Sequence, residues 1–572
     1  QVIGHQFFYE TGHDHFPMLM AARTMIVLFS IGTGLLVFLW SRQLFGTPGA
    51  FVSLGLFAFS PTFLAHGALA TSDMCMTFFF VASCWTWWRH LHRGGFTTWV
   101  LSALTFGFAC VAKHSAVLLI PMMVLMAFVR AGNSAPLTLG GRTFTSRPGK
   151  VGAAALSALA HGAVATVVIW AFYGFKYAAF NPALPAAAHF VRPWEVLDLH
   201  IGAIGKFIRV LESLRALPES FLYGSAYVVE TAQVRSAFLN GDYSTTGWVS
   251  FFPWTFALKT TLPLLVATLL VVSIVVRRWR RTPTAIRADL YAVAPLAVLF
   301  GVYWLFSLTS HLNIGHRHIL PTYPVLFIAA GALGRWLWTH RAGRLAVGLL
   351  IVAQAAEAAR ISPHFLAYFN ALAGGPAQGH RHLVDSSLDW GQDLPELKRW
   401  LDQHAHGATV FLSYFGLGEP DYYGIRAKRL PFVNGFKIPQ PYVRLAPGVY
   451  AISATTLSHV YSAIRGLWTL EHEKEYQELR ALEPLFEAYA QDPQRRIELE
   501  KEVPAAQWRK GITRHDQLRF ARLCHYLRLR RPEAQLGYSI HVYRLNGDEL
   551  AAATERSLTE WSRLLERAVA GP

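Results

Sequence analysis

Ten stretches of mostly apolar residues follow one another through the first 360 residues of the chain. A helix that crosses a bilayer needs about 20 such residues, so each stretch predicts a membrane-spanning helix. The fourth and fifth stretches are short and are separated only by Lys113 and His114, so one broken helix is the alternative there. The predicted spans are 19–42, 49–66, 72–90, 96–112, 115–130, 151–174, 253–276, 289–308, 319–338 and 344–360.

The pattern changes after residue 360, where short runs typical of strands alternate with amphipathic helices. Strands are predicted at TVFLSYF (409–415), GVYAISATTL (448–457) and YSIHVYRL (538–545). Helices are predicted at 393–405, 471–480 and 553–569, the first with a capping box formed by Asp393 and Glu396. The expected fold is an α-helical polytopic membrane protein of about ten spans (1–360, with a long loop at 175–252), followed by an α/β domain (361–572).

Composition and charge agree with this division. The 572 residues are 53% apolar and only 15% charged, whereas soluble domains carry about 25% charged residues. The net charge of +17 is concentrated in residues 1–360, which hold 26 Lys and Arg against 11 Asp and Glu; residues 361–572 hold 26 and 24. A basic charge confined to the apolar part indicates a lipid bilayer as partner and no nucleic acid.

Basic residues also give the predicted helices an orientation. Fifteen of them lie in connections on one side, together with a single acid, Asp289, and the positive-inside rule makes that side cytoplasmic. An even number of spans then places the loop 175–252 and the domain 361–572 outside, as in a multi-pass protein of a bacterial inner (plasma) membrane. The fifteen are Arg42, Arg89, Arg93, Arg130, Arg142, Arg147, Lys150, Arg277, Arg278, Arg280, Arg281, Arg287, Arg335, Arg341 and Arg344.

Three charged residues stand out in the short outer connections: Asp73, Lys113 and Arg317. Each has a simple structural explanation, since Asp73 suits a helix N-cap, Lys113 can reach the interface by snorkelling, and Arg317 can anchor a span. Together, one carboxylate and two cations at one end of a bundle suit an anionic ligand such as a phosphate. His316 and His318 flank Arg317 and on an extended segment would point the same way as metal ligands, but two ligands are too few for a metal site.

Other patterns point to structural roles. Asp385, Asp389 and Asp393 in DSSLDWGQD are spaced like a cation loop, but turn and capping roles explain them better. The sequence contains no Walker loop, nucleophile elbow or CxxC pair, which argues against ATP-driven transport and thiol chemistry.

Several longer segments carry a family resemblance. They are Ala22-Arg23 followed by a long span, WSRQLFG (40–46), SPTFLAHGALATSD (60–73), CVAKHSAVLLIP (110–121), GHRHILPTYP (315–324) and the tail segment 368–401. With these segments the chain resembles a bacterial GT-C membrane glycosyltransferase of the glycosyltransferase family 39 type, related to protein O-mannosyltransferases and lipid A aminoarabinose transferases.

The resemblance implies a reaction and roles for the candidate residues. Such enzymes move a sugar, with inversion, from a polyprenyl-phosphate carrier to an acceptor glycan, lipid or protein on the outer face of the membrane. Asp73 matches their second acidic site, which orients the acceptor or the base, and is the candidate catalytic residue. Lys113, His316, Arg317 and His318 match the region that holds the donor phosphate. No cofactor is implied with certainty, and a divalent metal is not indicated.

The usual base of this family, an Asp of an Asp-Glu pair, follows a first span that would precede Gln1. The sequence is therefore expected to be truncated at its N-terminus. Two rival functions stay open: a transporter or flippase of lipid-linked saccharides, and a scaffolding subunit. A transporter should show two matching halves with broken spans and charges at the membrane midplane, whereas the charges here are predicted at the outer edge.

Overall fold

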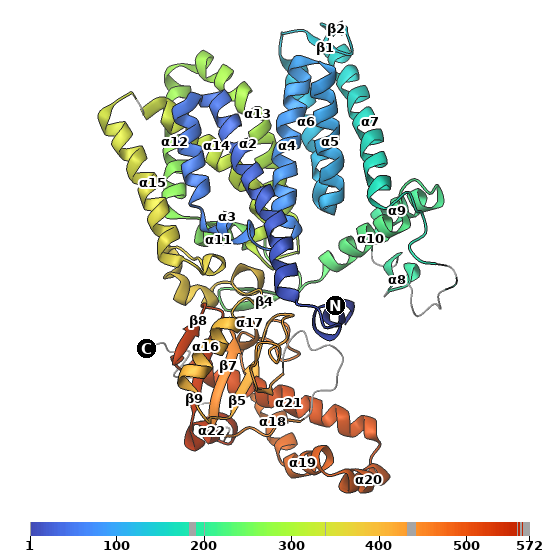
Figure 1. Cartoon of the computed structure of the whole chain (residues 1–572), viewed down its shortest axis with the longest axis vertical. Coiled ribbons are helices and arrows are strands. Elements are labelled where there is room, and N and C mark those ends of the chain that lie inside the picture. The colour runs from blue at the N-terminus through green and yellow to red at the C-terminus, as the bar shows by residue number, and fades with distance from the viewer. Residues whose placement is uncertain are drawn as a thin grey trace. The chain divides into compact units, whose positions relative to one another are not determined.

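The computed structural model (Figure 1) describes the chain except for residues 1, 182, 184–189, 191, 199–200, 338, 432–441, 558, 561–562 and 564–572. The chain forms two compact units. Residues 17–235 and 245–365 make up one, here called the helical unit; residues 1–16, 236–244 and 366–572 make up the other, here called the sheet unit.

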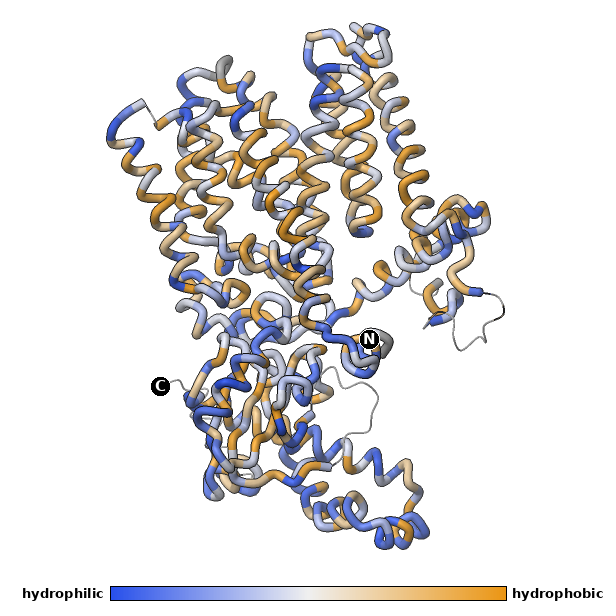
Figure 2. Tube along the Cα trace, in the orientation of Figure 1, coloured by the Kyte–Doolittle hydropathy of each residue, from blue (hydrophilic) through white to orange (hydrophobic). Residues whose placement is uncertain are grey.

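Long apolar helices build the helical unit, and Figure 2 shows hydrophobic residues along them and hydrophilic residues at their ends. Among the described residues, six helices are long and apolar enough to cross a membrane: His15–Ala58, His114–Gly132, Arg147–Phe172, Leu262–Arg281, Ile286–Thr309 and Arg341–Ile361. The predicted class, a helical polytopic membrane protein, is confirmed, but the count of ten spans is not.

The structure gives the following bounds for the helical unit. The elements are α2 (His15–Ala58), α3 (Pro61–His66), α4 (Ser72–Arg93), α5 (Phe96–Ala112), η2 (His114–Leu118), α6 (Leu119–Gly132), β1 (Leu137–Leu139), β2 (Arg142–Phe144), α7 (Arg147–Phe172), α8 (Trp194–Asp198), α9 (Gly202–Ser213), α10 (Glu219–Gln233), α11 (Phe251–Lys259), α12 (Leu262–Arg281), α13 (Pro283–Thr309), η4 (His316–Thr322), α14 (Tyr323–Leu337) and α15 (Arg341–Ile361).

Breaks in these helices have local causes. The first two predicted spans lie largely within α2, which is interrupted at Gly46, where φ is 76°, two residues before Pro48. Glycine tolerates this backbone conformation at little steric cost. The prediction of one helix over 253–276 is wrong: α11 ends at Lys259 and α12 begins at Leu262, because Thr260 and Thr261 are extended. Proline in the first turn of α12 suits a helix start, where its missing N–H costs nothing.

The predicted cytoplasmic connections are held by their own basic residues. Buried Arg130 donates to the carbonyl oxygens of Leu91, Ala135 and Pro136, and Lys150 donates to that of Asn133 at 2.7 Å. The single acid of this side, Asp289, forms ion pairs with Arg278 (3.3 Å) and Arg335 (3.5 Å). The basic residues therefore also satisfy backbone carbonyls where helices end.

Gly94, which ends α4, provides a test of this packing. Its φ is +64°, and a Cβ at this position would lie 1.8 Å from the carbonyl oxygen of Thr138 in β1. Gly94→Ala is expected to destabilise the helical unit by roughly 2–4 kcal/mol, the sum of backbone strain and overpacking. Gly140→Ala is the matched control, because φ is +57° there and nothing lies within 4 Å of the added carbon. Thermal denaturation of the purified chain should show a larger fall in Tm for Gly94→Ala; equal falls would contradict the close approach.

The sheet unit contains a mixed five-stranded sheet in the order β6-β5-β7-β9-β8. Strand β5 pairs in parallel with β6 and β7, whereas β9 pairs antiparallel with β7 and β8. The elements are α1 (Val2–His5), η1 (Gln6–Glu10), β3 (Ala237–Leu239), β4 (Asp242–Ser244), η6 (Ala371–Ala373), η7 (Pro376–Arg381), η8 (Asp385–Ser387), α16 (Leu394–His404), β5 (Val410–Ser413), β6 (Lys428–Arg429), β7 (Gly448–Ser453), α17 (Ala454–Leu457), α18 (Leu470–Arg480), α19 (Glu483–Gln491), α20 (Pro493–Glu502), α21 (Ala505–Arg528), β8 (Ala534–Leu536), β9 (Ile540–Leu545) and α22 (Gly547–Thr554); the short helix η5 (Phe365–Ala367) joins the two units.

Alternating side chains of this sheet pack on opposite faces. Tyr450 and Ile452 of β7 pack with Leu523 of α21, whereas Val449 and Ala451 pack with Leu397 of α16. The predicted α/β architecture is therefore confirmed, because a period of two residues buries both faces of a strand under helices. The three predicted strands are also confirmed, each with shorter bounds, as β5, β7 and β9. The predicted helices at 393–405 and 471–480 are confirmed as α16 and α18. The predicted start of a helix at 553 is wrong, because α22 ends at Thr554 and residues 555–557 are not helical; most of the remaining prediction, to 569, lies outside the described residues.

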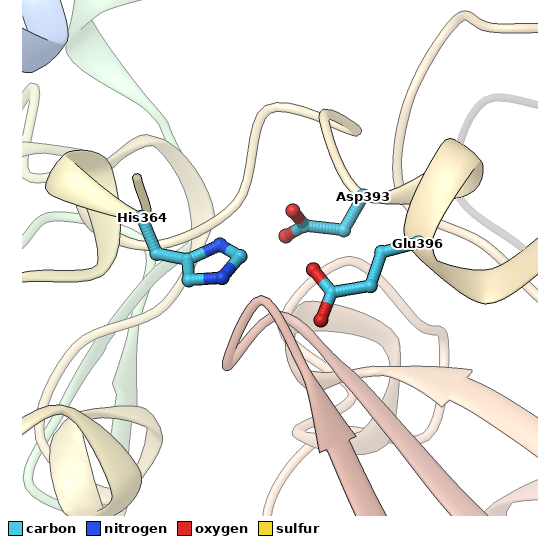
Figure 3. A group of neighbouring side chains, drawn as sticks. All are labelled: His364, Asp393 and Glu396. Atoms are coloured by element: carbon cyan, nitrogen blue, oxygen red, sulfur yellow. The ribbon is translucent and has the colours of Figure 1, made fainter. Parts of the chain in front are cut away.

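The capping box predicted at the start of α16 is wrong. Asp393 precedes the helix, but its side chain makes no capping hydrogen bond; its Oδ2 instead accepts from the hydroxyl of Ser539 at 2.5 Å. Figure 3 shows Asp393 and Glu396 beside the first turn of α16. The nearby Asp389 is buried, its Oδ1 accepts from the N–H of Gly391 at 2.9 Å, and burial raises the pKa of its carboxyl well above the ordinary value. A turn role for Asp389 is therefore confirmed.

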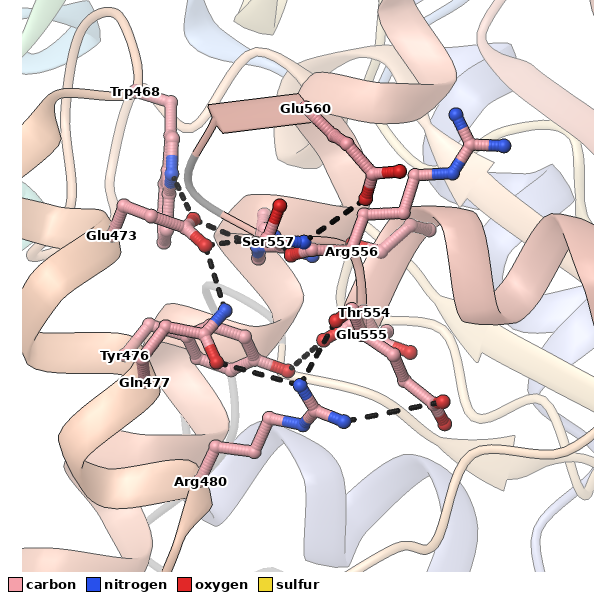
Figure 4. Close-up of polar contacts among 12 residues, drawn as sticks. Trp468, Glu473, Tyr476, Gln477, Arg480, Thr554, Glu555, Arg556, Ser557 and Glu560 are labelled. Atoms are coloured by element: carbon pink, nitrogen blue, oxygen red, sulfur yellow. Dashed lines mark hydrogen bonds and ion pairs between the residues drawn. The ribbon is translucent and has the colours of Figure 1, made fainter. Parts of the chain in front are cut away.

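A buried ion pair joins α18 and α21 in the sheet unit. Arg522 is 0% exposed and donates from Nε and Nη2 to the two carboxylate oxygens of Glu473, each at 2.8 Å. Trp468 and Gln477 donate to the same carboxylate (Figure 4). Burial by itself raises the pKa of Glu473, but the hydrogen bonds from Arg522, Gln477 and Trp468 outweigh it and hold the pKa below its ordinary value. Every oxygen of this buried charge is thus satisfied.

Candidate functional site

Asp73 lies in the first turn of α4, after a tight connection from α3. Thr71 occupies the N-cap position of α4, so the N-cap explanation for Asp73 is wrong. Arg23 of α2 fixes the connection by donating from Nε to the carbonyl oxygen of Ala68 at 2.6 Å. The Asp73 side chain is only 3% exposed, and its carboxylate meets cations from two other connections.

Lys113 is the first of these cations. Helix α5 ends at Ala112, and Lys113 is extended (φ −164°, ψ 142°) before η2 begins at His114. This break directs the side chain toward α4, and Nζ lies 2.6 Å from Oδ1 of Asp73. The basic side chain therefore forms a specific ion pair in place of the predicted snorkelling.

Arg317 is the second cation and comes from the connection between α13 and α14. It lies in the 3₁₀-helix η4, and its Nη1 is 3.4 Å from Oδ2 of Asp73. The structure thus brings Asp73, Lys113 and Arg317 together from three connections that are far apart in the sequence. Arg317 and Lys113 are 18% and 30% exposed, whereas Asp73 is 3% exposed.

The exposure and charge of this group decide what it can bind. One carboxylate beneath two cations leaves a formal charge of +1, and the more exposed partners are the cations. An anion can approach the guanidinium and the ammonium group, whereas a cation would meet the like charges first. Arginine adds the planar donor geometry that suits a phosphate or carboxylate.

The two histidines beside Arg317 do not point the same way. The predicted extended segment is a 3₁₀-helix, and with three residues per turn the side chains at positions i and i+2 diverge. The Nε2 of His316 lies 3.3 Å from the hydroxyl of Thr62, and its ring packs on His66 at 5.2 Å. Burial lowers the pKa of His316 and His318 well below the ordinary value, so both rings are neutral near pH 7. With these rings neutral, the positive charge in contact with Asp73 comes from Lys113 and Arg317.

His66 and Arg23 belong to the surroundings of the site but were not predicted as part of it. His66 is fully buried beside His316. It lies within the SPTFLAHGALATSD segment, and that segment was the signal from which its place near the site could have been predicted.

Within the described residues of the helical unit, no three His, Cys, Asp or Glu side chains gather closely enough to hold a metal ion.

The site and the basic connections lie at opposite ends of α4. Asp73 is the second residue of this helix and Arg93 is its last. At 1.5 Å per residue the two are separated by about 30 Å along the axis, which is the thickness of a bilayer core. The carboxylate and its two cations are therefore placed at the end of the bundle that faces away from the basic residues.

Comparison with known proteins gives one family match. The family described as dolichyl-phosphate-mannose-protein mannosyltransferase matches residues 15–170, which include Asp73 and Lys113. This match confirms the resemblance to GT-C glycosyltransferases for that part of the chain. No curated protein matches the sequence.

Two solved structures with some similarity are oligosaccharyltransferases. One is AglB from the archaeon Archaeoglobus fulgidus in complex with an inhibitory peptide and a dolichol-phosphate, with 12% identity, a TM-score of 0.38, and coverage of 68% of this chain and 47% of that chain. Another is the apo form of the Archaeoglobus fulgidus oligosaccharyltransferase, with 13% identity, a TM-score of 0.32, and coverage of 68% and 48%. The matched part of this chain thus spans about half the length of those proteins.

Proposed function

We propose that this chain, whose residues 15–170 match the mannosyltransferase family, is an inverting glycosyltransferase. It moves a sugar from a polyprenyl-phosphate carrier to an acceptor at the outer face of a bacterial inner membrane. The observation that carries the proposal is the pairing of Lys113 and Arg317 with one buried carboxylate, Asp73, at the end of the bundle opposite the basic connections.

The reaction needs a place for the charge that develops on the leaving group. As the acceptor hydroxyl oxygen attacks the anomeric carbon, the bond to the carrier phosphate breaks and the phosphate takes up the electron pair. Lys113 and Arg317 stabilise that negative charge from fixed positions, so little reorganisation is needed during the reaction. The lipid tail of the donor stays in the bilayer while its phosphate meets the cations at the bundle end.

Asp73 acts as the counter-ion that positions the two cations. A carboxylate with a cation on each oxygen binds a proton weakly, so Asp73 is poorly suited to take the acceptor's proton. The family resemblance assigns that proton transfer to an Asp-Glu pair. The positive-inside rule, applied to the basic connections, supports an orientation in which the domain 361–572 lies outside the cytoplasm.

Lys113→Met tests this function directly. Transfer of mannose from a polyprenyl-phosphate donor by the purified chain in vesicles is expected to fall by at least about tenfold, measured as release of the free carrier phosphate. Lys176→Met is the matched control, because Lys176 is exposed beyond the end of α7 and meets no part of the site; its activity should equal that of the native chain. Movement of the intact donor across the bilayer without cleavage would instead support a flippase.

A further inference from the structure

We propose that helix α9 is a membrane-surface helix whose exposed apolar side rests in the lipid bilayer. This helix lies in the loop between α7 and α11, outside the residues that match the mannosyltransferase family. The proposed contact is with the lipid acyl chains just below the headgroups of the membrane that the long helices cross.

Helix α9 has three distinct sides. One side is buried within the unit, where Ile201 (the N-cap residue of α9) and Ile208 pack with Leu222 of α10. A second side is exposed and apolar, with Ile204 55%, Phe207 63%, Val210 53% and Leu214 70% exposed. At 3.6 residues per turn, these four side chains fall within a sector of about 120°. The third side is exposed and polar and includes Lys206 and Ser213.

This apolar side is too continuous to be scattered surface hydrophobicity. Single exposed apolar residues are common on proteins, but a stripe of large side chains along one helix indicates an apolar partner. Helices that lie in the membrane interface show this combination of a wide apolar side and basic residues on the flanks. Here the flanks carry Lys206 and Arg215, which complement anionic lipid headgroups.

Hydrogen bonds place α9 beside the end of a membrane-spanning helix. Trp170, in the last turn of α7, donates from Nε1 to the carbonyl oxygen of Ala216 at 3.1 Å. Tyr177, just beyond α7, donates its hydroxyl to the carbonyl oxygen of Glu212 at 3.1 Å. Tryptophan and tyrosine mark the headgroup level of a bilayer, so α9 lies where α7 leaves the membrane. Figure 1 shows α9 at that end of α7.

The chain beyond α7 continues the apolar surface. Phe172 and Phe175 are 64% and 67% exposed, and they lie beside the same helix end as α9. The apolar side of α9 is thus an extension of the lipid-facing surface of α7. A second copy of the chain would have to cover both surfaces at once, whereas the bilayer already covers one of them.

Helix α10 connects this surface to the site. The hydroxyl of Ser225 lies 3.1 Å from Nδ1 of His114, and Phe221 packs on the same ring at 5.2 Å. His114 directly follows Lys113. The helix pair α9 and α10 therefore links the membrane surface to the backbone that carries one of the two cations.

The test is nitroxide labelling of single cysteines in the full chain, reconstituted in vesicles of phosphatidylethanolamine and phosphatidylglycerol. Phe207→Cys reports on the apolar side, and Ser213→Cys, on the polar side of the same helix, is the matched control. Both are made in a background in which the part-buried Cys75 and Cys110 are replaced by alanine. Molecular oxygen, which concentrates in acyl chains, and a water-soluble nickel chelate serve as the two collision probes.

The label at 207 is expected to collide with oxygen several-fold more than with the nickel chelate, and the label at 213 should show the reverse order. Removing the phosphatidylglycerol should reduce the difference, because Lys206 and Arg215 lose their anionic partners. Equal nickel accessibility at 207 and 213 would overturn the proposal, since α9 would then lie in water. Protection of 207 from both probes would also overturn it and would indicate a protein partner, such as a second copy of the chain.

Discussion

Replacing Arg317 by alanine is expected to lower the rate of sugar transfer by about 10²- to 10³-fold, the usual cost of removing one donor to a developing negative charge. The guanidinium is the planar donor of the site, and Nη1 already lies 3.4 Å from Oδ2 of Asp73, so its position is fixed before any ligand arrives. The larger share of the loss should be in kcat, because the charge on the phosphate grows as the bond to the sugar breaks. The measurement is the release of carrier phosphate by the purified chain in vesicles.

Two further variants decide what the loss means. Arg317→Lys keeps the charge but not the paired donors, and we expect an intermediate rate. Arg360→Ala removes an exposed arginine at the end of α15 and should leave the rate unchanged. A fully active Arg317→Ala variant that elutes as the native chain does would remove Arg317 from the phosphate site.

Glu473→Gln is the change with the largest expected effect on stability. The amide cannot neutralise Arg522, which is 0% exposed and also donates to the carbonyl oxygens of Ala553 and Arg556. An uncompensated charge at this depth costs about 3–5 kcal/mol. Amide hydrogen exchange in α18 and α21 of the purified chain should therefore accelerate by at least about a hundredfold. The site in the helical unit is not involved.

The surface pair Arg495 and Glu498 is the matched control. Both side chains are 57% exposed, one turn apart on α20, and exposed pairs contribute at most about 1 kcal/mol. Glu498→Gln should change exchange only slightly. A double variant, Glu473→Leu with Arg522→Met, removes both charges and should recover much of the protection; if it is no more stable than Glu473→Gln, the loss comes from packing and not from the unpaired charge.

The pattern of apolar residues predicted the class of fold and the position of nearly every long helix. It did not predict where helices break, because Thr260 and Thr261 suit a helix as poorly as several residues inside the spans that stay unbroken. The capping box at Asp393 failed for a different reason. The hydroxyl of Ser539, 146 residues away, donates a hydrogen bond to the carboxylate that the local pattern had assigned to capping the helix.

The candidate site shows the same limit. Asp73, Lys113 and Arg317 could be grouped from sequence because charged residues are few in the short connections that were predicted to be outer, and the structure brings the three together. The direction of His316 could not be predicted, since it depends on whether its segment is extended or forms a 3₁₀-helix. Its contact with Thr62 joins two connections that are 254 residues apart in the sequence.

The ends of the five-stranded sheet have a consequence for a protein confined to a membrane plane, where neighbouring copies meet often. Strand β6 offers only Lys428 and Arg429 at one edge, and β8 offers three residues at the other. Both edges are short and give a foreign strand little backbone to pair with, and the two basic residues of β6 also repel an identical edge. Crowding in the bilayer should therefore not drive the sheets of adjacent molecules to polymerise.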